Sequence, residues 1–224
     1  MKNFSKLILV AILAIFLGQS CQTFNLAHVP KGTPAEEKLP PLEPDFDIAS
    51  FGPNYADLYA APARILRGTQ GRAATVAESI GHTFTVAEDT KRIFAKELLN
   101  NICERVGESQ GYAVCRMGST SKGITNHLNP FVSVVTLGIA NLFGYKYATY
   151  RDELEIIVDV YNLENKVVGS FSGFGVGEAD VKIKDGYTRP SAQRMAHARA
   201  FVNAMQEIKE QMVSHKTELI VALN

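Results

Sequence analysis

The segment Gly107-Glu108-Ser109-Gln110-Gly111 matches the G-x-S-x-G pattern that carries the nucleophilic serine of many hydrolases. In those enzymes a strand enters the turn and a helix leaves it, which exposes the serine at a strained position. Here a helical pattern precedes the segment and a strand pattern follows it, so the order is reversed. No credible nucleophile–base pair accompanies Ser109. We therefore expect a glycine-terminated turn and predict no catalytic residue.

A second glycine pattern, Gly173, Gly175 and Gly177, has the alternation of a phosphate-binding loop. A dinucleotide site needs a helix to open directly after the glycines, so that its amino terminus faces the phosphate. Instead Glu178-Ala179-Asp180 follows and adds negative charge there. We expect a twisted strand end with bulges at the start of a loop over 173–186, and no cofactor.

Metal-binding patterns are weak in this sequence. The histidines are dispersed, at positions 28, 82, 127, 197 and 215. The acidic residues Asp159, Glu178, Asp180 and Asp185 lack EF-hand spacing. His197 lies near Arg194 and Arg199, and we expect it on a solvated or packed helix face. No metal site is predicted.

The chain contains three cysteines, Cys21, Cys103 and Cys115. Cys103 and Cys115 flank the predicted helix-to-strand turn, and their spacing without nearby histidine ligands is not that of a zinc site. In an oxidising compartment they could form a disulfide, which over so short a loop stabilises a protein by ~3 kcal/mol. Two buried free thiols are the alternative.

The amino-terminal residues have the features of a secretory signal. Lys2 and Lys6 precede the apolar run Leu7–Leu17, and Gly18-Gln19-Ser20 follows it. The run is shorter than the ~20 residues that span a bilayer. The position of Cys21 resembles that of a bacterial lipoprotein, in which this cysteine becomes the first, lipidated residue. An ordinary secretory cut after Ser20 is the alternative.

The resemblance implies a lipid anchor at Cys21 and, because Gln22 is not Asp, an outer-membrane protein that faces the periplasm. The inner membrane and the cell surface remain alternatives. We divide the chain into a signal peptide (1–20), a lipidated cysteine with a proline-rich tether (21–44), one folded domain (45–215) and a carboxy-terminal tail (216–224). Basic and acidic residues balance at 23 each, with no basic run, so nucleic-acid binding has no electrostatic support.

Periodicity within the domain predicts strands over 45–51, 110–117, 153–162 and 167–174, and a further short strand within 72–80. A capping-box pattern at Thr85-Val86-Ala87-Glu88 predicts the start of a helix that ends at Gly107. A final helix is predicted to begin near Pro190. This order indicates an α+β fold, a mainly antiparallel sheet with two long helices packed on one face.

The apolar segment 130–144 is either core or a surface that contacts a partner or the membrane. It is too short to span a bilayer as a helix. In the second interpretation the interface residues are Phe131, Val132, Val135, Leu137, Ile139, Leu142 and Phe143.

From Thr136 onward the layout resembles small periplasmic lipoproteins of envelope assembly, such as the curli-export lipoprotein. The resemblance rests on Leu137-Gly138, the hairpin pattern 154–174 and the final helix with Arg194, Ala196, Ala198 and Ala200. It implies a non-enzymatic binding or assembly domain whose partner is an envelope protein or a second copy. An oligomeric export-pore subunit is the alternative, followed by an envelope hydrolase that would use Ser109.

Overall fold

A computed structural model describes residues 23–51, 72–126, 146, 148–182 and 186–224 of the chain. The predicted signal peptide and Cys21 lie outside these residues. The same holds for the predicted interface residues Phe131, Val132, Val135, Leu137, Ile139, Leu142 and Phe143.

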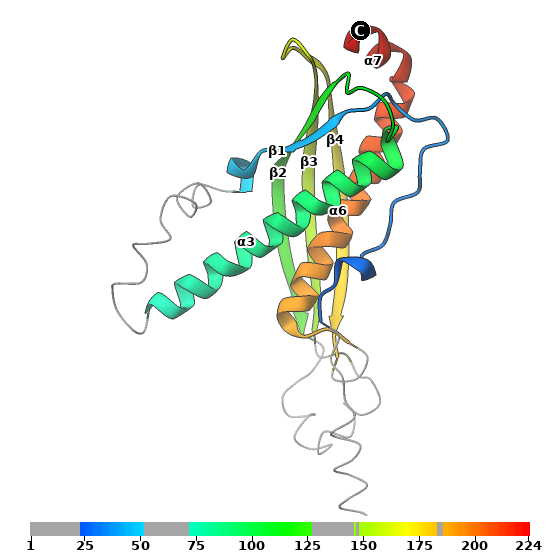
Figure 1. Cartoon of the computed structure of the whole chain (residues 1–224). Helices are drawn as coiled ribbons and strands as arrows, with labels where there is room; N and C mark the ends of the chain where they lie inside the picture. The colour runs from blue at the N-terminus through cyan, green and yellow to red at the C-terminus, as the bar shows by residue number, and fades with distance from the viewer. Residues whose placement is uncertain (1–22, 52–71, 127–145, 147, 183–185) are drawn as a thin grey trace, which may run out of the picture.

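Within the described residues, one sheet holds four strands in the order β1-β2-β3-β4. These strands are β1 (Glu43–Phe46), β2 (Gly111–Asn126), β3 (Ala148–Asn162) and β4 (Val167–Val181). Three α-helices accompany them, α3 (Arg72–Glu97), α6 (Arg189–Ser214) and α7 (Lys216–Leu223). Figure 1 shows α3 and α6 on the same side of the sheet. The predicted α+β class is confirmed in that helices and one sheet form a single compact body.

Two of the three strand pairs are antiparallel, in line with the predicted mainly antiparallel sheet, but the sheet is mixed and, among the described residues, three helices accompany it instead of the predicted two. β2, β3 and β4 are antiparallel, whereas β1 pairs in parallel with β2. The reason is the connection, because β1 reaches β2 through α3, and a crossover of that kind returns the chain in the same direction. The predicted order of strand 45–51, helix and strand 110–117 is compatible with this parallel pair.

Alternation follows the prediction over 111–117 of β2 and 153–162 of β3, whereas β2 continues to Asn126 and β3 begins at Ala148, which was not predicted. Ala113 and Cys115 of β2 and Ile156 and Val158 of β3 are all fully buried, so they form the face that the helices cover. The turn between β3 and β4 contains Asn165, whose positive φ of 63° suits an asparagine. The predicted hairpin is therefore present, although β4 continues to Val181 instead of ending at Phe174.

The glycines at 173, 175 and 177 lie inside β4 and not in a loop. A Cβ atom on Gly175 would lie 1.9 Å from the carbonyl oxygen of Ala200, and one on Gly177 would lie 2.0 Å from that of Ala196. Two strand residues advance ~6.7 Å and four helix residues advance ~6.0 Å. Every second residue of β4 therefore lies opposite every fourth residue of α6, which places the glycines against the alanines. The glycines therefore allow the backbone of α6 to approach β4 closely.

Polar side chains of α6 also cover the outer edge of β4. Arg199 and Asn203 donate to the carbonyl oxygens of Glu178 and Val176, and Gln211 donates to that of Ser172. Between them the carboxylate of Glu207 accepts from the Phe174 amide at 2.7 Å. This edge is consequently occupied and cannot accept another strand at these positions.

The first long helix begins earlier than predicted. α3 starts at Arg72, so the region 72–80 is helical and not a strand, and Thr85 lies inside the helix instead of capping it. A π-helical turn, η4 (Leu98–Ile102), ends this element. Gly107 has a φ of 131° but lies in the turn that follows, not at the helix end. A capping-box pattern is local and occurs within helices as well as at their starts.

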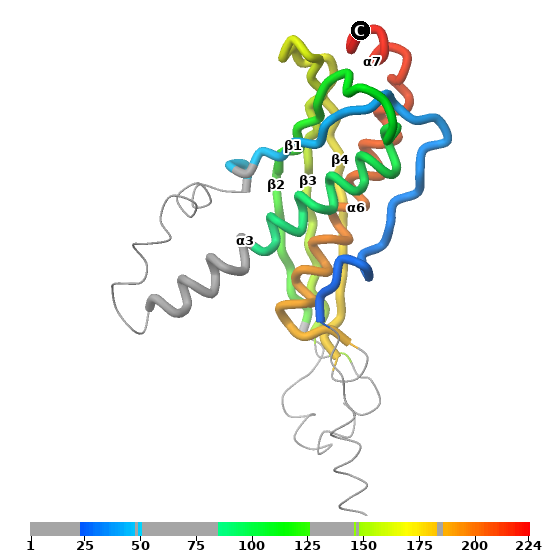
Figure 2. Tube along the Cα trace, viewed as in Figure 1, coloured from blue at the N-terminus to red at the C-terminus, as the bar shows by residue number. Residues whose placement is uncertain are grey.

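The expected proline-rich tether is docked on the domain over its described part. Leu39 and Leu42 are 0% and 2% exposed, and Leu39 bridges to Cys103. Figure 2 shows this segment running from the amino-terminal end of α6 along the domain and then across to β1. The apolar residues among its prolines are what hold it there. The expected tail is helical too, since α7 buries Leu219 and Leu223.

We expect Gly175→Ala to lower the free energy of unfolding by about 3 kcal/mol, because the added methyl group would overlap the Ala200 carbonyl. The measurement is urea denaturation. Gly123→Ala is the matched control, since a Cβ there meets only Arg151 at 3.9 Å, and it should change stability by less than about 0.5 kcal/mol. Equal stability of the two variants would contradict the close packing of α6 on β4.

Leu39→Ala should cost about 2–5 kcal/mol in the same assay, because it leaves a cavity in a fully buried position. Leu163→Ala, at a residue that is 69% exposed in the hairpin turn, is the control and should be close to neutral. A free tether would instead make both substitutions neutral.

Candidate functional site

Three buried polar side chains meet where α3, α6 and β3 come together. His197 of α6 lies with its Nδ1 atom 2.8 Å from Oδ2 of Asp152 in β3 and its Nε2 atom 3.1 Å from Oγ1 of Thr90 in α3. Their exposed fractions are 5%, 4% and 0%. We call His197, Asp152 and Thr90 the polar junction.

The polar junction has the residue types of a catalytic triad, but its hydroxyl is held by the helix backbone. The Thr90 hydroxyl donates to the Val86 carbonyl oxygen at 2.7 Å. A triad hydroxyl must instead give its proton to the histidine. Thr90 is also fully buried and out of reach of a substrate. These contacts give the three residues a role in joining the elements.

A salt bridge beside the polar junction connects it to the docked amino-terminal segment. Arg194 of α6 binds Asp89 of α3, with NH2 and Oδ2 2.7 Å apart, and its guanidinium carbon lies 4.1 Å from the ring centroid of Phe24. Burial raises the pKa of Asp89 although Arg194 opposes the shift. The amide of Phe24 donates to the Ser191 hydroxyl at 3.0 Å. Together these contacts hold Phe24 at the start of α6.

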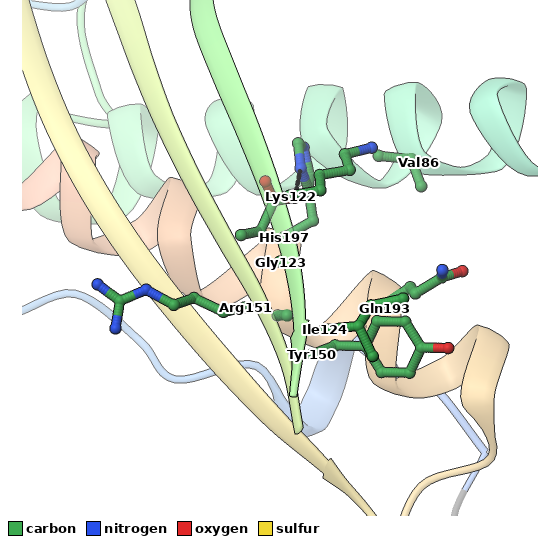
Figure 3. A pocket seen from close by; sticks show the side chains of 10 residues that line it. Val86, Lys122, Gly123, Ile124, Tyr150, Arg151, Gln193 and His197 are labelled. Atoms are coloured by element: carbon green, nitrogen blue, oxygen red, sulfur yellow. Dashed lines mark hydrogen bonds and ion pairs between the residues drawn. The ribbon is translucent and has the colours of Figure 1, made fainter. Parts of the chain in front are cut away.

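A cavity of about 310 Å³ opens next to the polar junction, between the helices and the ends of β2 and β3 (Figure 3). Its side-chain lining includes Lys122, Ile124, Tyr150, Gln193 and His197. Lys122 pairs in register with Asp152, and Ile124 with Tyr150, so all four side chains belong to the helix-facing side of the sheet. The other residues that line the cavity are Val86, Gly123, Arg151, Asp152 and Ala196.

One oxygen of Asp152 has no partner. Its Oδ2 atom binds His197, whereas Oδ1 is buried and accepts no hydrogen bond from any described residue. A buried polar atom without a partner costs about 1–3 kcal/mol, so native proteins rarely leave one. Asp152 lines the cavity, so this unpaired atom belongs to a residue of the cavity wall.

The two glycine motifs of the sequence, around Ser109 and at residues 173–177, do not line this cavity. Ser109 donates to the Gly111 carbonyl oxygen at 2.6 Å, in a turn that joins a helix to a strand in the expected order. The glycines of β4 face α6, which leaves no room for a phosphate. Among the described residues, no cluster of three His, Cys, Asp or Glu side chains could hold a metal ion.

No sequence pattern identified Asp152 as a site residue, and His197 was expected only on a solvated or packed helix face. Asp152 lies two residues before Leu154, in the same alternation that buries Leu154 and Ile156. A carboxylate at an inward position of a strand is the signal that could have identified it, but the predicted strand began one residue later. In the sequence His197 lies among apolar residues of a helix. Only its contacts with Asp152 and Thr90, which are distant in the chain, identify it as part of a site.

Cys103 and Cys115 are both buried free thiols, which is the second of the two alternatives. Burial raises the pKa of Cys103 to about 12 and also raises that of Cys115. At neutral pH both therefore stay protonated and unreactive.

Comparison with known proteins adds little. No family model and no curated protein matches the sequence. The solved structure of protein XCC0632 from Xanthomonas campestris, of the family DUF330, is similar over 88% of this chain and 97% of its own, with 12% identity and a TM-score of 0.32. At that level the similarity carries no argument about fold or function. No helix in the described part of this chain is long and apolar enough to cross a membrane.

In a Cys21→Ser variant, we expect a thiol reagent to label neither remaining cysteine in the native state and both in denaturant without reductant. A disulfide would give no labelling in either condition.

Because the unfolded thiols ionise near pH 9.0 while the folded ones do not, the free energy of unfolding should fall above that pH. The expected slope is about 1.4 kcal/mol per pH unit for each thiol.

Proposed function

We propose that this protein is a membrane-anchored envelope lipoprotein, lipidated at Cys21, with a non-enzymatic binding or assembly domain. The observation that carries the proposal is the docking of the amino-terminal segment. The hydrogen bond from Phe24 to Ser191 fixes the chain three residues after Cys21 at one end of the domain. An extended chain spans ~3.5 Å per residue, so the anchor would lie within about 11 Å of that end.

The residues that flank the predicted interface segment lie at the same end of the domain. Asn126, the last residue of β2, pairs with Ala148, the first of β3, and Ala148 pairs with Val181 of β4. Val181 in turn bridges to Tyr187, just before α6 begins. Asn126 and Ala148 are therefore close to the start of α6, where Phe24 is held. This supports the proposed role of that segment as a surface that contacts the membrane or a partner.

The two edges of the sheet differ in a way that supports partner binding. α6 side chains occupy the outer edge of β4, as described above. β1 covers only Tyr112–Cys115 of β2, and within the described residues no other strand pairs with that edge from Gly118 to Asn126. An unpaired edge can accept a strand from another chain. A partner that adds a strand there would also lie close to the anchored end.

The two alternative functions, an export-pore subunit and an envelope hydrolase, have no comparable support among the described residues. The hairpin of β3 and β4 has α6 on one face and charged side chains such as Arg151, Glu153 and Glu178 on the other. That distribution gives no support to an export-pore segment. The hydroxyls of Ser109 and Thr90 both donate to backbone carbonyl oxygens, so neither supports a hydrolase.

We expect the wild-type protein to fractionate with membranes and to carry the mass of a lipidated amino-terminal cysteine, whereas Cys21→Ser should be released in soluble form. Membrane fractionation followed by mass spectrometry of the detergent extract makes the test. An unmodified mass at Cys21, with both proteins soluble, would contradict the anchor.

The double substitution Val135→Asp with Leu137→Asp should reduce association with partners at least tenfold while the circular dichroism and unfolding midpoint stay unchanged. The control is Leu163→Asp, an exposed apolar residue at the opposite end of the domain. Site-specific crosslinking in cells measures association. If the double variant unfolds, the segment is core and the interface interpretation is wrong.

A further inference from the structure

The cavity beside the polar junction is not explained by anchoring or by strand addition. We propose that it binds a small uncharged ligand rich in hydroxyl groups, about the size of a monosaccharide, with one hydroxyl between Asp152 and Lys122. Figure 3 shows the side chains that surround this space.

The first argument is the unpaired oxygen of Asp152. The residue is 4% exposed and its Oδ1 atom has no hydrogen-bond donor among the described residues, although Asp152 lines the cavity. The His197 ring and its two hydrogen bonds hold the carboxylate in place. A hydroxyl that donated to this buried atom would supply the hydrogen bond that it lacks.

The second argument is the charge opposite this oxygen. Lys122 and Asp152 are directly opposed on β2 and β3, yet the carboxylate forms its hydrogen bond with His197 and not with Lys122. A lysine ammonium only donates and a carboxylate only accepts hydrogen bonds. A group between them must accept from one and donate to the other, which a hydroxyl does.

Charged ligands fit this pair less well. An ammonium group that binds Asp152 would lie close to the like charge of Lys122, and a phosphate or carboxylate that binds Lys122 would lie close to that of Asp152. Repulsion between like charges that lie close together in a partly buried site disfavours binding. An uncharged hydroxyl avoids both conflicts.

The walls of the cavity suit the same class of ligand. Val86, Ile124 and Ala196 are apolar, and the ring of Tyr150, which is 9% exposed, adds a flat surface for C–H groups. In Figure 3 the Tyr150 hydroxyl and the Gln193 amide point to the same side, where both could bind further hydroxyls. A volume of about 310 Å³ lies at the lower end of known ligand pockets, and so favours a small sugar.

The test measures binding of glucose, N-acetylglucosamine and myo-inositol to the full chain with Cys21→Ser, by ligand-observed saturation-transfer NMR. Ethanolamine and inorganic phosphate are the charged comparison probes. We expect at least one of the three hydroxyl-rich probes to bind with a millimolar or lower Kd, and at least tenfold more tightly than either charged probe.

Lys122→Met and Asp152→Asn should each weaken that binding about tenfold. Arg151→Met is the matched control. Arg151 is one of the residues that line the cavity, but its guanidinium binds Glu153 and Glu178 and points away in Figure 3, so this substitution should leave Kd unchanged. If Asp152→Asn does not fold, Lys122→Met decides, since Lys122 is exposed on β2.

Three results would overturn the proposal. These are the absence of binding by all three hydroxyl-rich probes, equal or tighter binding of ethanolamine or phosphate, and an unchanged Kd in Lys122→Met. Because the variants all carry Cys21→Ser, a failure here leaves the proposed lipid anchor untouched, and a failure of the anchor leaves this site untouched.

Discussion

The close approach of α6 to β4 is the constraint on which the rest of the structure depends. Ala196 and Ala200 of the helix lie against Gly177 and Gly175 of the strand, with no space for a side chain on the strand. Glycine weakens an isolated strand, so this interface must recover that stability through burial and backbone contacts. Because α6 lies so close to β4, one row of its side chains lies along the strand edge. These side chains, Arg199 and every fourth residue after it, form hydrogen bonds with the backbone groups of that edge.

The same placement of α6 organises the anchored end of the domain. One turn of the helix contributes Arg194 to Phe24 and Asp89, and His197 to Asp152 and Thr90. The docked segment, the polar junction and the cavity therefore share one helix turn. A ligand in the cavity and an anchor on the segment would act on the same elements, which gives the proposed functions a common structural basis without making either depend on the other.

Much of the fold was accessible from the sequence where a pattern was local. The alternation over 111–117 and 153–162 and the start of the final helix near Pro190 agree with the structure, in which α6 begins at Arg189. The errors occur where a residue's role depends on a distant partner. The glycines of β4 indicate a loop by local preference, but they serve a helix that follows them in the chain. The prolines of 23–44 indicate a tether, but Leu39 is buried against residues near Cys103.

The sequence by itself determined the α+β class, the hairpin, the final helix and the inward sides of β2 and β3, because each follows from a periodicity over a few residues. Only the tertiary structure decided that β1 is parallel, that the amino-terminal segment is docked and that His197 meets Asp152 and Thr90. These depend on residues as far apart as positions 90 and 197, whose approach is set by packing in three dimensions and leaves no periodic pattern in the chain.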